Sequence, residues 1–136
     1  MGVPATLLKK MYVSGSLRNT SQGFRFTLKN RIAPATIIRF DEVHAMGRAF
    51  GPEEIFVHIG TKTYPASEIS ERRSIRFRVN DVMDVEVKGF HLPPGEHILT
   101  CRIYVQEVGW LRVPVEDVVL PTRENDPSWI PEPVAV

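Results

Sequence analysis

The side chains best suited to metal binding in this chain are its four histidines, His44, His58, His91 and His97. No two of them have the i, i+4 spacing of a helical HExxH zinc site, and none lies beside the cysteine. His91 and His97 flank a proline turn, so they could meet across a hairpin and form a two-histidine site together with Glu96. Solvated loop histidines explain the same pattern more simply. We therefore expect no metal ligands in this chain.

Nucleophilic and acid–base chemistry has equally little support. Cys101, the single cysteine, alternates with Leu99 and Ile103 on the apolar side of an expected strand, which indicates a buried and inert thiol. The sequence has no GxSxG, P-loop or GxGxxG motif. Adjacent carboxylates point to opposite faces of a strand and form no acid–base pair; these are Asp41 and Glu42, Glu53 and Glu54, and Glu116 and Asp117. We expect no catalytic and no cofactor-binding residue.

The composition is that of a soluble globular domain. The 136 residues include 17 Lys and Arg against 16 Asp and Glu, a formal net charge of +1, which argues against nucleic acid as a partner. No apolar run approaches the roughly 20 residues of a membrane-spanning helix, and no signal peptide is recognisable. We expect a cytoplasmic protein that binds neither nucleic acid nor a membrane.

The elements that must position these side chains are strands. Polar and apolar residues alternate with a period of two in 24–29, 75–79 and 82–87, as in half-buried strands. Residues 55–59 lead through Gly60 and Thr61 into a returning strand, as in a tight hairpin. Further strands are expected at 8–13, 36–43, 98–106, 111–115 and 118–120, with at most one helical turn at 66–71.

This pattern predicts an all-β fold: an antiparallel, jelly-roll-like β-sandwich with little or no helix. A single sandwich domain would occupy residues 1–120, and a proline-rich C-terminal tail residues 121–136. The predicted core consists of Phe24, Phe26, Leu28, Val57, Ile59, Phe77, Val79, Leu99, Cys101 and Ile103.

Several apolar residues fall where the predicted fold would leave them in water. The tail carries Trp129 and Ile130, which either fold back over the sandwich or dock on another subunit. Residues 34–51 contain an expected long loop, 44–51, that offers Met46 and Phe50 as apolar contacts. Trp110 lies at a strand turn. We expect all five residues at a partner interface.

Arg18 and Asn19 precede the strand at 24–29 and complete that predicted interface. Two interpretations stay open for them. Either Asn19 caps a turn while Arg18 pairs with a nearby carboxylate, or Arg18 reaches a partner or the rim of its active site.

The segment 15–26, GSLRNTSQGFRF, is the most distinctive in the chain. A Leu-Arg-Asn triplet, a short polar spacer and Gly-Phe-x-Phe at the start of a strand resemble the beginning of the small β-subunits of C-glycoside deglycosidases. The later hairpin at 55–64 and the Pro-Gly-Glu-His sequence at 94–97 follow in a similar order. The resemblance extends over roughly residues 8–120.

This resemblance implies an accessory role in a carbon–carbon lyase. In that family the small β-sandwich subunit associates with a TIM-barrel α-subunit in a hetero-oligomer, and the α-subunit carries the catalytic residues and a divalent metal of the Mn or Mg type. Together they cleave the bond between a 3-oxo-sugar and a flavonoid-like aglycone by β-elimination, in which the ketone acidifies the neighbouring C–H. The expected lack of a self-sufficient active site in this chain is compatible with such a role.

An alternative is a carbohydrate-binding or general interaction module built on the same sandwich. A sugar-binding face would show a shallow aromatic platform, and the chain offers only two Trp and three Tyr to build one. A cupin-like metal enzyme is disfavoured because the histidines are not clustered.

Overall fold

The computed structural model describes residues 3–120 and contains ten strands and four short helices. In chain order these are α1 (Ala5–Leu8), η1 (Lys9–Met11), β1 (Arg18–Asn19), β2 (Gly23–Lys29), β3 (Ala35–Ala45), β4 (Arg48–Phe50), η2 (Pro52–Glu54), β5 (Ile55–Ile59), β6 (Lys62–Pro65), η3 (Ala66–Glu68), β7 (Ile75–Phe77), β8 (Val82–Lys88), β9 (Gly95–Val105) and β10 (Gly109–Val119). The η elements are single turns of 3-10 helix.

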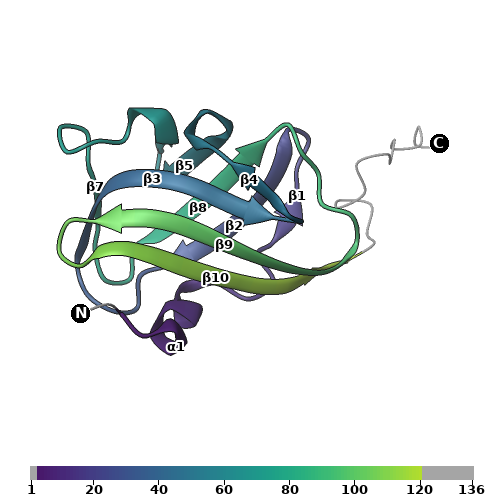
Figure 1. Cartoon of the computed structure of the whole chain (residues 1–136), viewed down its shortest axis with the longest axis horizontal. Helices are drawn as coiled ribbons and strands as arrows, with labels where there is room; N and C mark the ends of the chain where they lie inside the picture. The colour runs from purple at the N-terminus through teal and green to yellow at the C-terminus, as the bar shows by residue number, and fades with distance from the viewer. Residues whose placement is uncertain (1–2, 121–136) are drawn as a thin grey trace, which may run out of the picture.

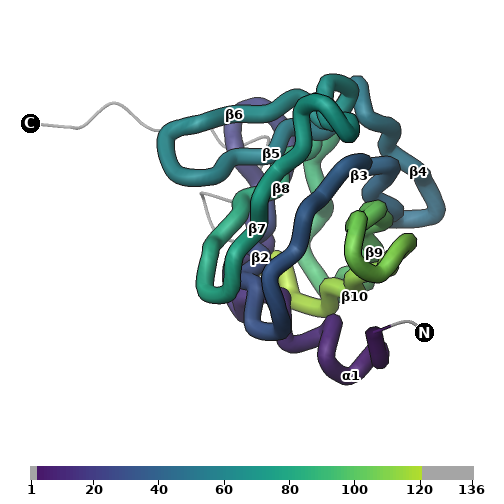
Figure 2. The backbone as a smooth tube through the Cα atoms, turned by 90° about the vertical axis from the view of Figure 1, so that its left-hand side faces the viewer, coloured from purple at the N-terminus to yellow at the C-terminus, as the bar shows by residue number. Residues whose placement is uncertain are grey.

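The strands form two sheets that pack face to face. Sheet A has the strand order β1-β2-β8-β5-β6, and sheet B the order β10-β9-β3-β4, with β7 also paired to β3. Figure 1 looks onto sheet B, and Figure 2, turned by 90°, separates the two layers. The ladders between the named strands are antiparallel. The predicted antiparallel β-sandwich is therefore confirmed.

The core lies between the sheets and follows from alternation along each strand. In β2, Phe24, Phe26 and Leu28 are completely buried, while the residues between them are only partly covered. The expected core residues are buried with two exceptions, Ile59 and Val79. Ile59 is half-buried because it ends β5 at the turn. Val79 is 43% exposed because β7 ends two residues before it and the chain turns there.

Residues 8–13, expected to form a strand, are mostly helical, so that prediction is wrong. The short helices α1 and η1 turn Leu8 and Met11, three residues apart, toward the core. Tyr12 is the one residue of this segment that pairs with a strand, by an isolated bridge to Leu28. Both views place α1 below β10, where the two elements are in contact (Figures 1 and 2). Among residues 3–120, no helix is long and apolar enough to cross a membrane.

The expected long loop at 44–51 is also wrong, because this segment is a tight hairpin. β3 continues to Ala45, and Met46 and Gly47 turn the chain into β4 with positive φ angles of 54° and 72°. Two consecutive residues with positive φ angles form the type of two-residue turn whose twist matches that of the paired strands. Phe50, at the end of the hairpin, is fully buried and meets Phe24 edge-on at 5.9 Å.

β9 and β10 form the longest hairpin of the fold. Their ladder runs from Val105 opposite Gly109 to Gly95 opposite Val119 without a break. The two separate strands expected at 111–115 and 118–120 are thus one strand that passes through Pro114. An edge position tolerates that proline, because its missing N–H need not serve a neighbour. The tail at 121–136, with the expected interface residues Trp129 and Ile130, lies outside the described residues.

Candidate functional site

The outer surface of the β9–β10 hairpin collects large exposed side chains. Inward and outward positions alternate along both strands, so Trp110 and Tyr104, which lie opposite each other, share the outer face. Trp110 is 42% exposed, Ile98 71% and Val118 45%. We call Trp110, Tyr104, Arg102, Ile98 and Val118 the Trp110 face. Trp110 and Tyr104 lie near the turn of the hairpin, and Ile98 and Val118 lie near its other end.

Trp110 is fixed in place although it is exposed. The Arg102 guanidinium lies over the indole ring, 4.0 Å from its centroid, and Tyr104 meets the ring edge-on at 5.1 Å and 84°. Arg102 in turn donates a hydrogen bond of 2.7 Å to the Asp41 carboxylate on β3. The ring is held by two side chains of β9, one of them anchored to β3, so its order does not depend on a partner.

Two other predicted interface residues lie in the β3–β4 hairpin and have opposite environments. Met46, at the turn, is 54% exposed and free to meet a partner. Phe50 is completely buried between Phe24 and Phe90, so it offers no surface to a partner. Its expected place at an interface is therefore wrong, because the segment is a hairpin that turns Phe50 inward.

Arg18 and Asn19 stabilise the fold itself. Asn19 is buried, and its side-chain amide makes two 2.8 Å hydrogen bonds with the backbone N–H and C=O of Leu92. Arg18 donates to the carbonyl of Ser16 and lies 3.5 Å from the carboxylate of Asp84. Of the two interpretations left open by the sequence, pairing of Arg18 with a nearby carboxylate is the one observed. Arg18 also borders an open hollow of about 480 Å³, so part of it stays accessible.

The outer face of sheet A carries a chain of hydrogen bonds from a hydroxyl through an imidazole to a carboxylate. His58 Nδ1 lies 2.9 Å from the Thr63 hydroxyl, and His58 Nε2 lies 2.8 Å from a carboxylate oxygen of the buried Glu86. Acyl-transfer triads use the same order of groups. Here, however, the hollow that borders Thr63 is lined by residues of β6 and the segment 68–74 and does not reach His58. This chain of hydrogen bonds connects β6, β5 and β8 across sheet A.

The remaining titratable groups considered for chemistry are held by the backbone or buried. His91 and His97 each donate one hydrogen bond from Nε2 to a backbone carbonyl, that of Thr20 at 2.8 Å and that of Pro93 at 2.6 Å. Cys101 is completely buried, and desolvation raises the pKa of its thiol far above the usual value, which confirms the expected buried thiol. Within residues 3–120, no three His, Cys, Asp or Glu side chains are grouped closely enough to hold a metal ion.

One further cluster, which no motif in the sequence indicates, connects the N-terminal segment to β10. The Tyr12 hydroxyl donates to Asp117 Oδ2 at 2.6 Å and accepts from the backbone N–H of Leu17 at 2.8 Å. The backbone N–H groups of Gly15 and Val118 also donate to Asp117, at 2.7 Å each. Tyr12 and Asp117 are 105 residues apart, so neither residue indicates the other in the sequence.

The protonation of this cluster follows from its geometry. Burial, reinforced by the hydrogen bond to Asp117, raises the pKa of Tyr12 to about 12. For Asp117 the opposing effect of burial is outweighed by the hydrogen bonds from Tyr12, Val118 and Gly15, so its pKa lies below the usual value. A neutral tyrosine therefore faces an ionised carboxylate across the physiological range.

Comparison with known proteins assigns the chain to a family. The family model described as hydroxymethylglutaryl-CoA reductase, N-terminal domain, matches residues 7–120. None of the curated proteins matches the chain. The resemblance to C-glycoside deglycosidase β-subunits, from which a lyase of flavonoid C-glycoside metabolism was expected, is thus wrong. Its motif has a structural explanation: Asn19 holds Leu92, and a Cβ on Gly23 would lie 1.9 Å from the Val87 carbonyl oxygen. The chain belongs to the family of the hydroxymethylglutaryl-CoA reductase N-terminal domain.

Proposed function

We propose that this domain is a non-catalytic interaction module that docks onto a catalytic partner through the Trp110 face. The observation that carries the proposal is an ordered tryptophan that stays 42% exposed. Tryptophan and arginine are the residues most enriched among interface hot spots. Because Arg102 and Tyr104 already fix the ring, a partner that covers it would lose little side-chain entropy.

The polar clusters of the fold support a non-catalytic role. The Thr63–His58–Glu86 chain, the Tyr12–Asp117 pair and the Asn19 amide each connect segments that are distant in the sequence. Their donors and acceptors are engaged with one another or with the backbone. An accessory role without a self-sufficient active site stays a prediction, as does a cytoplasmic location.

The geometry of the aromatic pair favours a protein partner over a sugar. A sugar-binding platform needs rings that lie flat and share a plane, whereas Tyr104 and Trp110 are nearly perpendicular, at 84°. One side of the indole is also covered by Arg102. Ile98 and Val118 extend the exposed apolar surface along the hairpin, which suits the core of a protein interface more than a carbohydrate.

The family description suggests which partner to test first. It names the N-terminal domain of a hydroxymethylglutaryl-CoA reductase, so the catalytic part of that class of enzyme is our candidate. Carbon–carbon bond cleavage, a TIM-barrel α-subunit and a divalent Mn or Mg ion in that subunit were expected from the overturned resemblance alone. They have no other support, and we do not carry them into the proposal.

Calorimetric titration against the reductase catalytic domain of the same organism tests both parts of the proposal. We expect saturable binding that Trp110→Ala weakens about 30-fold or more, the equivalent of a hot spot of about 2 kcal/mol. Val82→Ala, which truncates an exposed valine on the outer face of sheet A, is the matched control and should bind as the wild type does.

The possible results test the docking surface and the identity of the partner separately. Equal binding by Trp110→Ala and the wild type would contradict the Trp110 face as the docking surface. An absence of binding by the wild-type chain would contradict the reductase as the partner.

A further inference from the structure

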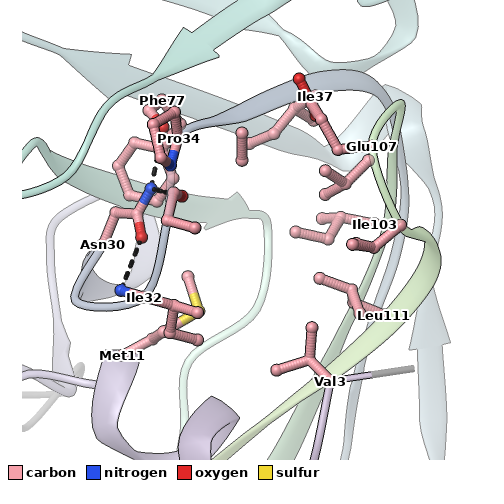
Figure 3. Close-up of a pocket in the computed structure, with 14 residues that line it drawn as sticks. Val3, Met11, Asn30, Ile32, Pro34, Ile37, Phe77, Ile103, Glu107 and Leu111 are labelled. Carbon is pink, nitrogen blue, oxygen red and sulfur yellow. Dashed lines mark hydrogen bonds between the residues drawn. The ribbon is translucent and has the colours of Figure 1, made fainter. Parts of the chain in front are cut away.

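An apolar cavity lies at the end of the sandwich where β9 turns into β10, on the inner side of the hairpin whose outer side carries Trp110. Ile37, Ile103 and Leu111 form one wall, from strands of sheet B, and Met11 and Val3 of the N-terminal segment close it from below (Figure 3). The labelled side chains surround an open space. The cavity has a volume of about 110 Å³ and opens to solvent on one side.

The polar side chains at this cavity already make hydrogen bonds with the residues that form its walls. The buried Asn30 amide donates to the carbonyls of Ala33 and Phe77, both at 2.8 Å, and accepts from the N–H of Ile32 at 3.1 Å. Asn30 thus braces the loop that forms one side. Both N–H donors of this amide are therefore engaged, and its oxygen already accepts one hydrogen bond.

Glu107 braces the opposite side in the same way. Its two carboxylate oxygens accept from the backbone N–H and the hydroxyl of Thr36, each at 2.8 Å. Those hydrogen bonds lower the pKa of Glu107. The rim therefore carries a fixed negative charge, which disfavours an anionic guest.

The size and lining define the class of guest. An apolar cavity of about 150 Å³ is large enough to stay dry and bind benzene or xenon. The present cavity is somewhat smaller, but its open side leaves room for one edge of a ring. Its walls are held in place by hydrogen bonds, so it does not collapse when empty.

We propose that this cavity is a binding site for a small uncharged apolar molecule, a single ring or a branched aliphatic group. The proposal is independent of the docking function, because the cavity faces the interior and the Trp110 face lies on the outside of the same hairpin. A free small molecule fits better than a partner side chain, since the space lies between the sheets and not on a face.

Benzene is the probe, and methyl NMR spectra of the full chain are the readout. We expect saturable shifts of the Ile37 and Ile103 methyl groups, which line the cavity. We expect none at Ile55, the buried first residue of β5, which does not line it. Benzoate should produce no such shifts, because its carboxylate would lose its hydration in the apolar cavity and would face the Glu107 charge at the rim. Xenon, which is smaller still, should shift the same two methyl groups.

A filled cavity provides the decisive control. Ala35→Leu places a larger side chain on the cavity wall. Ala49→Leu, at an exposed position on β4, is the matched control. The first change should weaken benzene binding about tenfold or more, and the second should leave it unchanged. Leu111→Phe fills the space from the other side if Ala35→Leu does not fold.

Three results would overturn the proposal: no saturable shift at the lining methyl groups, equal benzene affinity in the filled variants, or benzoate binding as strong as that of benzene. The first would mean that the cavity takes no guest of this size. The second would place the guest elsewhere, and the third would contradict the chemical class.

Discussion

Replacing Tyr12 by Phe removes one hydroxyl that connects three separate parts of the chain. That hydroxyl donates to Asp117 on β10 at 2.6 Å and accepts from the backbone N–H of Leu17 at 2.8 Å. The ring itself packs in the core and is 9% exposed, so Phe fills the same space. The change therefore isolates the hydrogen bonds from the packing.

The expected cost is about 2–4 kcal/mol in the free energy of unfolding at pH 7. A hydrogen bond to a charged group contributes about 1.5–3 kcal/mol, and a buried N–H left without a partner costs about 1–3 kcal/mol. The raised pKa of Tyr12 adds nothing to this figure, because burial, its largest cause, disfavours the ionised phenol and does not stabilise the neutral one.

The raised pKa also predicts the sign of the pH dependence. A group whose pKa is higher in the folded state contributes its stability fully below the pKa of the unfolded chain, near 10, and loses it as the pH rises through the folded value, about 12. The stability difference between the wild type and Tyr12→Phe should therefore be constant from pH 7 to 9 and shrink between pH 10 and 12.

Urea unfolding followed by circular dichroism measures this difference at each pH. Tyr64→Phe is the matched control, because the Tyr64 hydroxyl makes no hydrogen bond with another residue of 3–120, and its cost should stay below about 0.5 kcal/mol. A cost below about 0.5 kcal/mol for Tyr12→Phe, or a difference that does not change above pH 10, would refute this account of the cluster.

Three further predictions concern the same fold. Asn19→Ala should lower the free energy of unfolding by about 2–3 kcal/mol, because it leaves both backbone groups of Leu92 buried without partners; an unchanged urea midpoint would contradict that role. Phe77→Ala should cost about 3–5 kcal/mol, since Phe77 is 1% exposed, and a loss below about 1 kcal/mol would contradict its inward orientation. The pKa of Asp117 is lowered, so its contribution is present above the unfolded value of about 4 and is lost as the pH falls through the folded value. The advantage of the wild type over Asp117→Asn in urea should therefore shrink on acidification, and an advantage independent of pH would exclude the carboxylate charge as its source.

The strands with clear alternation could be predicted from the sequence, and those decided by distant contacts could not. In β2, alternation alone identifies Phe24, Phe26 and Leu28 as buried, because one face of the strand is in the core and the other is not. The helices α1 and η1 are too short to show a helical period, so Leu8 and Met11 also fitted a strand.

The β3–β4 hairpin escaped prediction for a different reason. Turns of this kind favour Asn or Asp before Gly, and here Met46 takes that position with a φ of 54°. Without the usual residue, the segment reads as a loop, and Phe50 reads as exposed. Pairing across the hairpin turns it inward.

The candidate site was only partly within reach of the sequence. Trp110 is recognisable as an exposed aromatic residue near a turn, and Tyr104 follows once the β9–β10 register is known. Asp41 is not recognisable, because β3 pairs with β9 through two irregularities in register, one of them between Phe40 and Glu42. Which carboxylate pairs with Arg102 therefore depends on a β-bulge that the sequence pattern does not indicate.

The two outer faces of the sandwich differ in the desolvation free energy that a partner would have to overcome to cover them. On sheet A, a partner would have to remove water from Arg18, Arg25 and Asp84, whose ion pairs are long, at 3.5 and 3.2 Å. The Nε atom of Arg25 is already buried without a hydrogen-bond partner, so this guanidinium depends on the hydration of its exposed part, which a partner would have to remove.

On sheet B, the Arg102 charge that lies over Trp110 is already balanced. Arg102 is paired with Asp41 at 2.7 Å, so covering the indole and this guanidinium buries no unpaired charge. Ile98 and Val118 add exposed apolar area that gains free energy when it is covered. The surface around Trp110 and Arg102 can therefore be covered at lower cost than the Arg18, Arg25 and Asp84 cluster of sheet A, which is why we place the partner there.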